Sequence, residues 1–188
     1  SLIQHIQNYH EYYAKDENWK NFVLHNKGTE AWEQDKALIR TAGKVGCPIF
    51  VCNCNKVESL SEHDNCEQAI RYFRELLETG QETGVKIALY NCRWNNSFVC
   101  CEPYWSLILG ALPELGIKYD ASHCINESEN DYLEEIRDWG HRFYHVHIKD
   151  VRIESAAGAN TLRDTKGVLE FAARSWNYVT PGSGHGED

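Results

Sequence analysis

Helix and strand signals alternate along most of this chain, and this alternation limits the fold more than any other feature. Amphipathic helical segments lie between short apolar runs. Consecutive strands that are joined through helices form right-handed βαβ units in a parallel sheet. The sequence therefore predicts an α/β fold with about five βα units in sequential spatial order. The strands are expected at five apolar runs: residues 48–54, 85–90, 117–120, 142–148 and 176–180.

The strongest helix signal runs from Ser61 to Gly84, where apolar residues recur on one face and the two glycines Gly80 and Gly84 mark the end. Thr29 is expected to cap an earlier helix that ends near residue 43. Shorter helices are predicted at 105–112, at 131–139 and from about Lys166 to 173. Residues 1–28 are less regular and are expected to form one helix and a loop. Because no low-complexity linker interrupts the chain, residues 1–188 are predicted to form a single domain.

The charge of the chain argues against a nucleic-acid partner. The net charge is −9, and binding to phosphates needs a local surplus of lysine and arginine. The longest apolar stretch, 105–112, is far shorter than the roughly 20 residues that cross a bilayer. No leader with a charged and then an apolar segment opens the sequence. We therefore expect a cytoplasmic protein with neither a nucleic-acid nor a membrane partner.

The cysteines leave more than one interpretation open. Cys52-Asn-Cys54 and the adjacent Cys100-Cys101 do not have the spacing of common structural zinc sites. Four disulfides are an alternative, but an alternating α/β chain favours reduced thiols in a cytoplasm. A soft-metal cluster at the predicted strand ends is a further alternative, with the candidate ligands Cys52, Cys54, Cys92 and Cys124.

Two polar motifs follow apolar runs: Asp120-Ala-Ser-His123 and His145-Val-His147-Ile-Lys149-Asp150. A carboxylate and an imidazole at the ends of successive strands are typical ligands of a divalent metal. Period-2 alternation places His145 and His147 on the same side of their strand. Two co-facing histidines at a strand end are hard to explain by packing alone, and His145 is interpreted as a core residue or a support of the ligands. Asp120 is the candidate carboxylate ligand, although a carboxylate that caps the next turn is the simpler alternative.

These motifs, together with Gly84-Val-Lys-Ile-Ala-Leu and Pro181-Gly-Ser-Gly, resemble the sugar phosphate isomerase/epimerase superfamily. This is the group of xylose isomerase-like TIM barrels, and the resemblance runs from about residue 30 to the end. It implies a partial parallel (β/α)8 barrel and a divalent metal (Mn, Zn, Mg or Co) held by two Glu, an Asp and a His. Asp120 and His147 match the Asp and His ligands. His123 matches a histidine that contacts the substrate and is predicted to be catalytic.

Further residues are assigned from their position beside these motifs. Lys149 is a predicted catalytic group, and a solvated ion pair of Lys149 with Asp150 is the alternative. Asp150, Arg152 and Trp94 are predicted to contact the substrate, with a plain surface role as the alternative for Arg152.

The chain departs from the pattern of the superfamily at two positions. Tyr90 stands where the first Glu ligand is usual, and a phenol is mostly protonated at neutral pH. Either Glu102 or Asn91 replaces that ligand, or Tyr90 packs and no metal binds with useful affinity; Glu102 is the predicted ligand. The second Glu belongs to a strand that would follow Asp188. The chain also contains no methionine, so a fragment of a barrel without its first strands and its last strand is expected.

The resemblance implies an enzyme that isomerises, epimerises or dehydrates a polyhydroxylated carbohydrate with the help of a metal ion. Alone, this chain is expected to bind the ion weakly and to turn over little substrate. The alternative is a non-catalytic or degenerate barrel that binds a carbohydrate or a partner protein. An endonuclease-type barrel that acts on abasic DNA shares the fold, but the charge of −9 argues against it. Open sheet edges are expected to expose apolar surface and to favour a homo-oligomer.

Overall fold

The structure is a computed structural model in which residues 30–54, 56–57, 59–92, 99–125, 132–153, 163–164, 167–168 and 176–184 are described. The chain divides into two compact units, Ser1–Lys118 and Tyr119–Asp188, and each is described separately. The expected structure of residues 1–28 lies outside the described residues.

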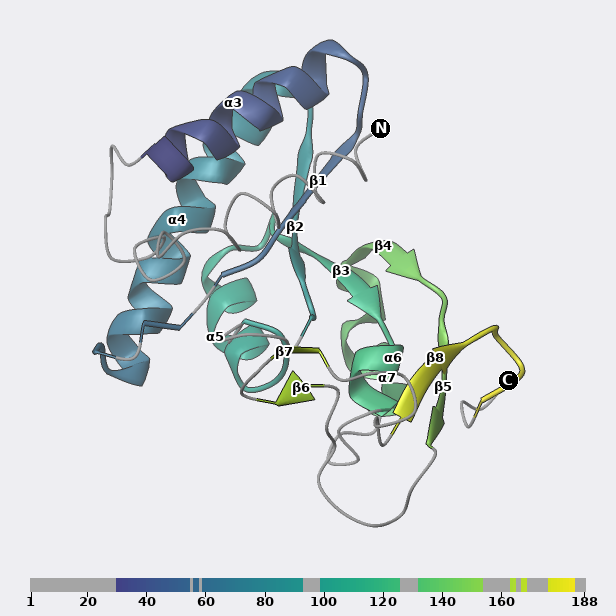
Figure 1. Ribbon diagram of the computed structural model, residues 1–188. Coiled ribbons are helices and arrows are strands. Elements are labelled where there is room, and N and C mark those ends of the chain that lie inside the picture. Colours follow the sequence, from purple (N-terminus) through teal and green to yellow (C-terminus); the bar gives the residue numbers. More distant parts are fainter. Residues whose placement is uncertain are drawn as a thin grey trace. The chain divides into compact units, whose positions relative to one another are not determined.

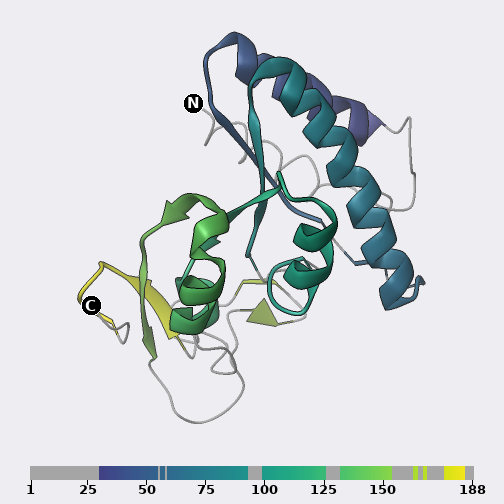
Figure 2. The ribbon, with the colours of Figure 1, turned by 180° about the vertical axis from the view of Figure 1, so that it is seen from behind.

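The first unit consists of parallel strands and the helices that connect them. Its elements are α3 (Glu30–Lys44), β1 (Ile49–Cys52), α4 (Glu62–Thr83), β2 (Lys86–Tyr90) and α5 (Tyr104–Ala111). The helices α3 and α4 lie side by side along β1 and β2, as both views show (Figures 1 and 2). Fully buried side chains such as Ile39, Phe73 and Leu76 fill the space between these helices and the strands. These elements confirm the predicted helix–strand alternation.

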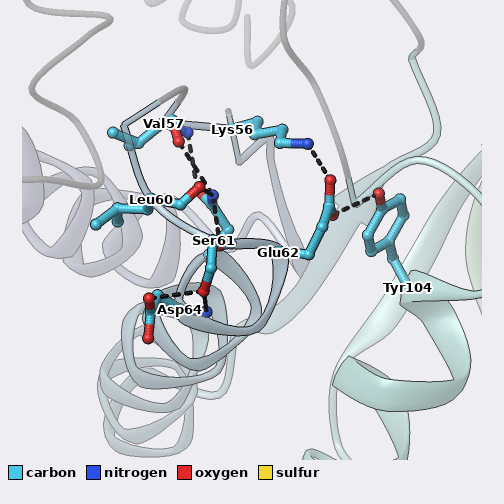
Figure 3. Close-up of polar contacts among 8 residues, drawn as sticks. Lys56, Val57, Leu60, Ser61, Glu62, Asp64 and Tyr104 are labelled. Atoms are coloured by element: carbon cyan, nitrogen blue, oxygen red, sulfur yellow. Dashed lines mark hydrogen bonds and ion pairs between the residues drawn. The ribbon is translucent and has the colours of Figure 1, made fainter.

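The long helix α4 begins and ends where the sequence predicts. Ser61 caps it, because the Ser61 Oγ accepts a hydrogen bond from the backbone N–H of Asp64 at 3.1 Å. The Ser61 hydroxyl also donates to the Asp64 carboxylate at 2.6 Å (Figure 3). Gly84 ends the helix with a φ of 72°, a left-handed conformation that glycine adopts without strain. Local capping therefore fixes both ends of α4.

The strand order of the main sheet is β1-β2-β3-β4, with β3 at Gly116–Asp120 and β4 at Phe143–His147. The pairs β1–β2 and β2–β3 are parallel, with Ile49 opposite Lys86 and Ala88 opposite Gly116. This arrangement confirms a partial parallel barrel fold with sequential strands. All five residues of β3 are buried, and β3 crosses the boundary between the two units.

The second unit contains α6 (Ser122–Ile125), α7 (Tyr132–Trp139), the 3₁₀ helix η1 (Gly140–Arg142), β5 (Asp150–Ile153) and β8 (Trp176–Val179) besides β4. The Tyr119 ring stacks on Phe143 with centroids 4.3 Å apart. The Tyr119 hydroxyl and the Cys124 thiol both donate to one oxygen of the buried Glu135 carboxylate, at 2.9 and 2.7 Å. Their hydrogen bonds offset the cost of burying that carboxylate.

The prediction that the fifth strand is parallel is wrong. β8 forms where a strand is expected, but it pairs antiparallel with β5, so that Asp150 lies opposite Val179. No strand was predicted directly after residue 148, where the charged residues Asp150 and Arg152 make the sequence polar. Those two residues alternate with Val151 and Ile153, which is the period of a strand.

The helix expected from about Lys166 is also wrong at its start. β6 (Arg163–Asp164) pairs antiparallel with β7 (Gly167–Val168). Glycine costs about 1 kcal/mol in a helix interior, and valine favours strands. The rest of that predicted helix lies outside the described residues.

Apolar side chains are exposed on β4 and directly after it. Val146 is 49% exposed and Ile148 is 79% exposed, as expected for an open edge of a barrel sheet. Self-association through this edge stays a prediction. All eight cysteines are free thiols. Among the described residues, no helix combines the length and the apolar character that crossing a membrane requires.

Candidate active site

The candidate site of the second unit is built around the carboxylate of Asp120, the last residue of β3. This side chain is fully buried. Its Oδ1 accepts hydrogen bonds from the Ser122 hydroxyl at 2.5 Å and from the Ser122 backbone N–H at 3.2 Å. The tight turn from β3 into α6 therefore fixes one oxygen, and Oδ2 is left for the groups that converge on it.

Three basic groups surround Asp120 Oδ2. The Lys149 Nζ lies 2.8 Å from it, the His123 Nε2 3.6 Å and the His147 Nδ1 3.7 Å. Only the lysine is within hydrogen-bond distance. Burial acts to raise the pKa of Asp120, but His123, Lys149 and Ser122 outweigh it and hold this pKa below its usual value. The carboxylate is therefore ionised at neutral pH. The structure thus brings together four of the residues that the sequence singles out.

His123 lies between this carboxylate and an aromatic side chain. The imidazole is only 3% exposed. Its Nδ1 lies 3.3 Å from the hydroxyl of Tyr178 on β8, and the two rings meet edge to face. A phenol that donates to Nδ1 would leave the proton of a neutral imidazole on Nε2, which faces Asp120. The Tyr178 hydroxyl and the Asp120 carboxylate thus flank the two ring nitrogens of His123, which can hold a proton.

Lys149 has an aromatic neighbour as well as its carboxylate. Its Nζ lies 4.2 Å from the centroid of the Tyr178 ring, within the range of a cation–π interaction. The side chain is 32% exposed. Lys149 therefore connects Asp120 with Tyr178 and still reaches solvent, where a ligand can approach it.

The two histidines of β4 lie on one side of the strand, as their spacing predicts. Their ring centroids are 5.3 Å apart. Both side chains are exposed, and of the two, His147 is the one within 4 Å of Asp120. This geometry supports the choice of His147 over His145 as the residue that acts with Asp120.

Asp150 holds the Pro181-Gly-Ser-Gly184 turn. Its carboxylate accepts hydrogen bonds from the backbone N–H groups of Val151 at 2.7 Å, Gly182 at 3.1 Å and Gly184 at 2.7 Å. A Cβ atom at position 184 would overlap this carboxylate, so glycine is required there. The side chain is 6% exposed. Substrate contact by Asp150 stays a prediction, but its described contacts are structural.

Glu102, Arg152 and Trp94 are the remaining candidate site residues. Both oxygens of Glu102 accept hydrogen bonds from the Ser106 hydroxyl, each at 2.9 Å, and Glu102 is an exposed residue of the first unit. Arg152 is exposed on β5. Trp94 lies outside the described residues. The expected roles of these three residues stay predictions.

A divalent metal does not fit the described donors. Asp120 Oδ2 and His147 Nδ1 are two candidate ligand atoms. Asp120 Oδ2, however, already contacts the Lys149 ammonium. Within the part of the chain that the structure describes, no group of three or more His, Cys, Asp or Glu residues is arranged to hold a metal. A structural or catalytic site needs about four protein or water ligands. The described donors therefore do not complete a metal site.

Sequence reasoning missed two residues that contribute to the strand ends. Tyr178 sits in a strand that was predicted, but nothing in its sequence neighbourhood links it to His123. Lys118 was interpreted only as part of a strand. It is 2% exposed, and its Nζ lies 3.7 Å from the centroid of the Tyr90 ring. A lysine two residues before Asp120 was the available signal, because alternation puts both on one face of β3.

A model of the family described as the xylose isomerase-like TIM barrel matches residues 8–187. The chain belongs to this family. The resemblance inferred from the motifs is thereby confirmed. The chain is also 38% identical over 119 residues to the uncharacterized protein YfiH of Bacillus subtilis, a match that covers 62% of this chain and 37% of YfiH.

Solved structures show the same fold. The xylose isomerase domain protein of Planctomyces limnophilus aligns with a TM-score of 0.59 at 20% identity, over 82% of this chain and 50% of that protein. The D-psicose 3-epimerase of Clostridium cellulolyticum, solved with D-tagatose, aligns with a TM-score of 0.54 at 15% identity, over 66% of this chain and 47% of the epimerase. The chain thus spans about half the length of these two structures.

Proposed function

We propose that the protein shifts a proton on a polyhydroxylated small molecule, as a sugar isomerase or epimerase does. Family membership supports this class of reaction, since neighbours in the fold include enzymes that epimerise sugars. The observation that carries the proposal is the cluster of Asp120, His123 and Lys149 at the end of β3, with Asp120 fully buried. A buried, ionised carboxylate that orients a histidine and a lysine is suited to acid–base chemistry on hydroxyl and carbonyl oxygens.

The residues of the cluster have distinct roles in this proposal. His123 holds or moves the proton of a substrate oxygen through Nε2, and Tyr178 fixes its tautomer through Nδ1. Lys149 donates a hydrogen bond to a substrate oxygen on which negative charge develops. Asp120 contacts both groups and orients them. We also propose that the protein acts in the cytoplasm and binds no nucleic acid.

A second candidate is a barrel that binds a carbohydrate without converting it. The observation that favours it is Tyr90, because the family pattern places a carboxylate at this strand end. Tyr90 does not supply the carboxylate that would take the proton from carbon at this strand end. The two candidates predict different results for a single measurement.

That measurement is the exchange of carbon-bound hydrogen for solvent deuterium. Ketoses, aldoses, sugar acids and sugar phosphates are incubated with the protein in D₂O, and deuterium incorporation is followed by proton NMR. The proposal predicts exchange on the carbon next to the carbonyl of at least one compound, lowered 100-fold or more, on the order of a lost general acid–base group, in His123→Gln. His141→Gln is the matched control, because His141 is exposed and stacks on Trp139 away from the cluster. Saturable binding of a sugar with no exchange would support the second candidate.

A further inference from the structure

Tyr119, Cys124 and Glu135 of the second unit form a buried polar group, which we call the Glu135 cluster. The Tyr119 hydroxyl and the Cys124 thiol both donate to Glu135 Oε2, at 2.9 and 2.7 Å. The three residues are 1%, 0% and 7% exposed, in that order. The Tyr119 hydroxyl also lies 3.3 Å from the backbone carbonyl of Tyr132. One side-chain oxygen of α7 thus meets donors from β3 and from α6.

The two donors of the Glu135 cluster are direct chain neighbours of residues in the candidate active site. Tyr119 precedes Asp120 at the end of β3, and Cys124 follows His123 in α6. Side chains alternate along a strand, so Tyr119 points to the face of β3 opposite to Asp120. Glu135 therefore contacts the two segments that carry Asp120 and His123, and at β3 it does so from the opposite face of the strand.

The helix α6 depends on contacts of this kind more than a long helix would. It spans Ser122–Ile125, about one turn, and the Cys124 backbone N–H donates to the Ala121 carbonyl at 2.9 Å. A helix this short is not stable by itself, so its tertiary contacts determine where it lies. A displacement of α6 would carry His123 with it. The distance of 3.6 Å between His123 Nε2 and Asp120 Oδ2 would then change.

Hydrogen bonds fix a position more narrowly than apolar packing does, because both their length and their angle are restricted. Burial raises the pKa of Tyr119, and Cys124 and Glu135 raise it further. The phenol therefore stays protonated at neutral pH and continues to donate. A buried carboxylate and two buried donors are costly when any of them is unpaired. The Glu135 cluster therefore favours one arrangement of β3, α6 and α7.

We propose that Glu135 is a positioning residue of the candidate active site. It fixes Asp120 and His123 relative to each other through their neighbours Tyr119 and Cys124, and it does not touch the substrate. Groups that act on a substrate must be held within about 0.5 Å of the productive geometry, and supporting hydrogen bonds provide this precision. The effect on catalysis rests on the proposed function, whereas the effect on the geometry of His123 does not.

The test compares two uncharged substitutions of Glu135 in the full chain. Glu135→Gln keeps an acceptor oxygen, whereas Glu135→Met has a similar length and no oxygen. Glu134→Met is the matched control, because Glu134 is the exposed neighbour in the same helix. Circular dichroism shows whether each variant is folded. If Glu135→Met does not fold, Tyr119→Phe replaces it, since this change removes one donor and keeps the ring that stacks on Phe143.

The first readout is the NMR signal of the His123 ring nitrogens at neutral pH. These nitrogens face the Tyr178 hydroxyl at 3.3 Å and Asp120 Oδ2 at 3.6 Å, so their chemical shifts report both contacts. We expect matching shifts for the natural chain, Glu135→Gln and Glu134→Met, and changed or averaged shifts for Glu135→Met. Unchanged His123 shifts in a folded Glu135→Met would overturn the inference. Equal changes in Glu135→Gln and Glu135→Met would also overturn it.

The second readout separates local loosening of α6 from a general loss of stability. Cys124 and Cys54 are both fully buried free thiols, and Cys54 belongs to the first unit. Labelling of the native protein with N-ethylmaleimide, mapped by mass spectrometry, follows the opening around each thiol. Glu135→Met should label at Cys124 about 10-fold faster or more than Glu135→Gln, on the order of a buried donor left unpaired, with Cys54 unchanged. An equal increase at both thiols would overturn the inference. Tyr119→Phe should change both readouts in the same direction as Glu135→Met.

An activity measurement separates this inference from the proposed function. If deuterium exchange is observed, Glu135→Met should lower kcat by about 10- to 100-fold through misplaced groups and leave KM nearly unchanged. Glu135→Gln should keep most of the rate. A fall in kcat/KM that comes from KM alone would contradict a positioning role. No exchange by the natural chain would count against the proposed function, and the NMR and labelling readouts would still decide the inference.

Discussion

Charged side chains are buried near the ends of β2 and β3, but they contact different partners. At the end of β3, Asp120 is a buried carboxylate with a lysine and two histidines around one oxygen. At the end of β2, Tyr90 offers a ring to the ammonium of Lys118. The first end matches the motifs of the family, whereas the second departs from them. The contrast suggests that function follows the charge at each strand end more than the fold they share.

The largest expected effect comes from removing the charge of the first end. Asp120→Asn should lower the free energy of unfolding by about 2 kcal/mol, because the amide loses charge-assisted hydrogen bonds while Lys149 keeps its charge. Solvent reaches Lys149, which is 32% exposed, and this screening limits the loss. Urea unfolding at neutral pH measures the effect. Ser122→Ala is the control, and it should cost about 1 kcal/mol because only one neutral donor is lost. A loss for Asp120→Asn no larger than this would mean that the basic groups do not depend on the carboxylate.

The second prediction concerns the turn that Asp150 holds in the same unit. Gly184→Ala should destabilise the chain by about 1–3 kcal/mol, because the added methyl group overlaps the Asp150 carboxylate. Gly110→Ala is the matched control in α5, where a Cβ meets no atom within 4 Å. It should raise the free energy of unfolding by about 1 kcal/mol through helix propensity. Equal effects of the two substitutions in thermal unfolding would contradict the structural role of Asp150.

The third prediction tests the weaker interaction at β2. Tyr90→Leu removes the ring beneath the Lys118 ammonium and should cost about 1 kcal/mol, the range of a partly buried cation–π contact. Tyr90→Phe keeps the ring and should stay within about 0.5 kcal/mol of the natural chain in urea unfolding. If phenylalanine and leucine destabilise equally, the hydroxyl rather than the ring stabilises this end.

The smallest effect is a pH dependence of Tyr104, the first residue of α5. A hydrogen bond to the Glu62 carboxylate, with a contribution from burial, raises the pKa of Tyr104 from 10.0 to about 12 (Figure 3). Since the pKa is raised on folding, this interaction stabilises the chain fully below the unfolded pKa. The stabilisation is lost as the pH rises through about 12. The near-ultraviolet absorbance of phenolate follows this titration, and Glu62→Gln should lower its midpoint. An unchanged midpoint would mean that Glu62 does not hold the tyrosine.

Local signals were sufficient to predict much of the fold. Ser61 and Gly84 determine the ends of α4 through capping, which depends on nearby residues alone. The apolar runs of β1, β2 and β3 were found because buried parallel strands are largely hydrophobic. The pairing of β5 with β8 was missed because antiparallel pairing joins distant residues, and the charges of Asp150 and Arg152 concealed a strand.

The candidate site was predictable where residues stand in a motif. Asp120, His123, His147 and Lys149 lie in two short segments, and the fold brings them to one oxygen. Tyr178 and Lys118 could not be assigned, because their roles come from the side chains they meet rather than from their neighbours in sequence. The metal-ligand role of Glu102 could not be judged from sequence either, since its bonds to Ser106 depend on the turn into α5.

The central claim is that the Lys149 ammonium, not a divalent ion, neutralises the Asp120 carboxylate at the end of β3. The most direct measurement is a crystal structure of the chain soaked in Zn²⁺, with anomalous data collected at the zinc edge. The account predicts no anomalous peak beside Asp120, with Lys149 still hydrogen-bonded to the carboxylate and Lys118 still on the Tyr90 ring. A zinc ion within about 2.0–2.2 Å of Asp120 and His147, with Lys149 displaced, would contradict it.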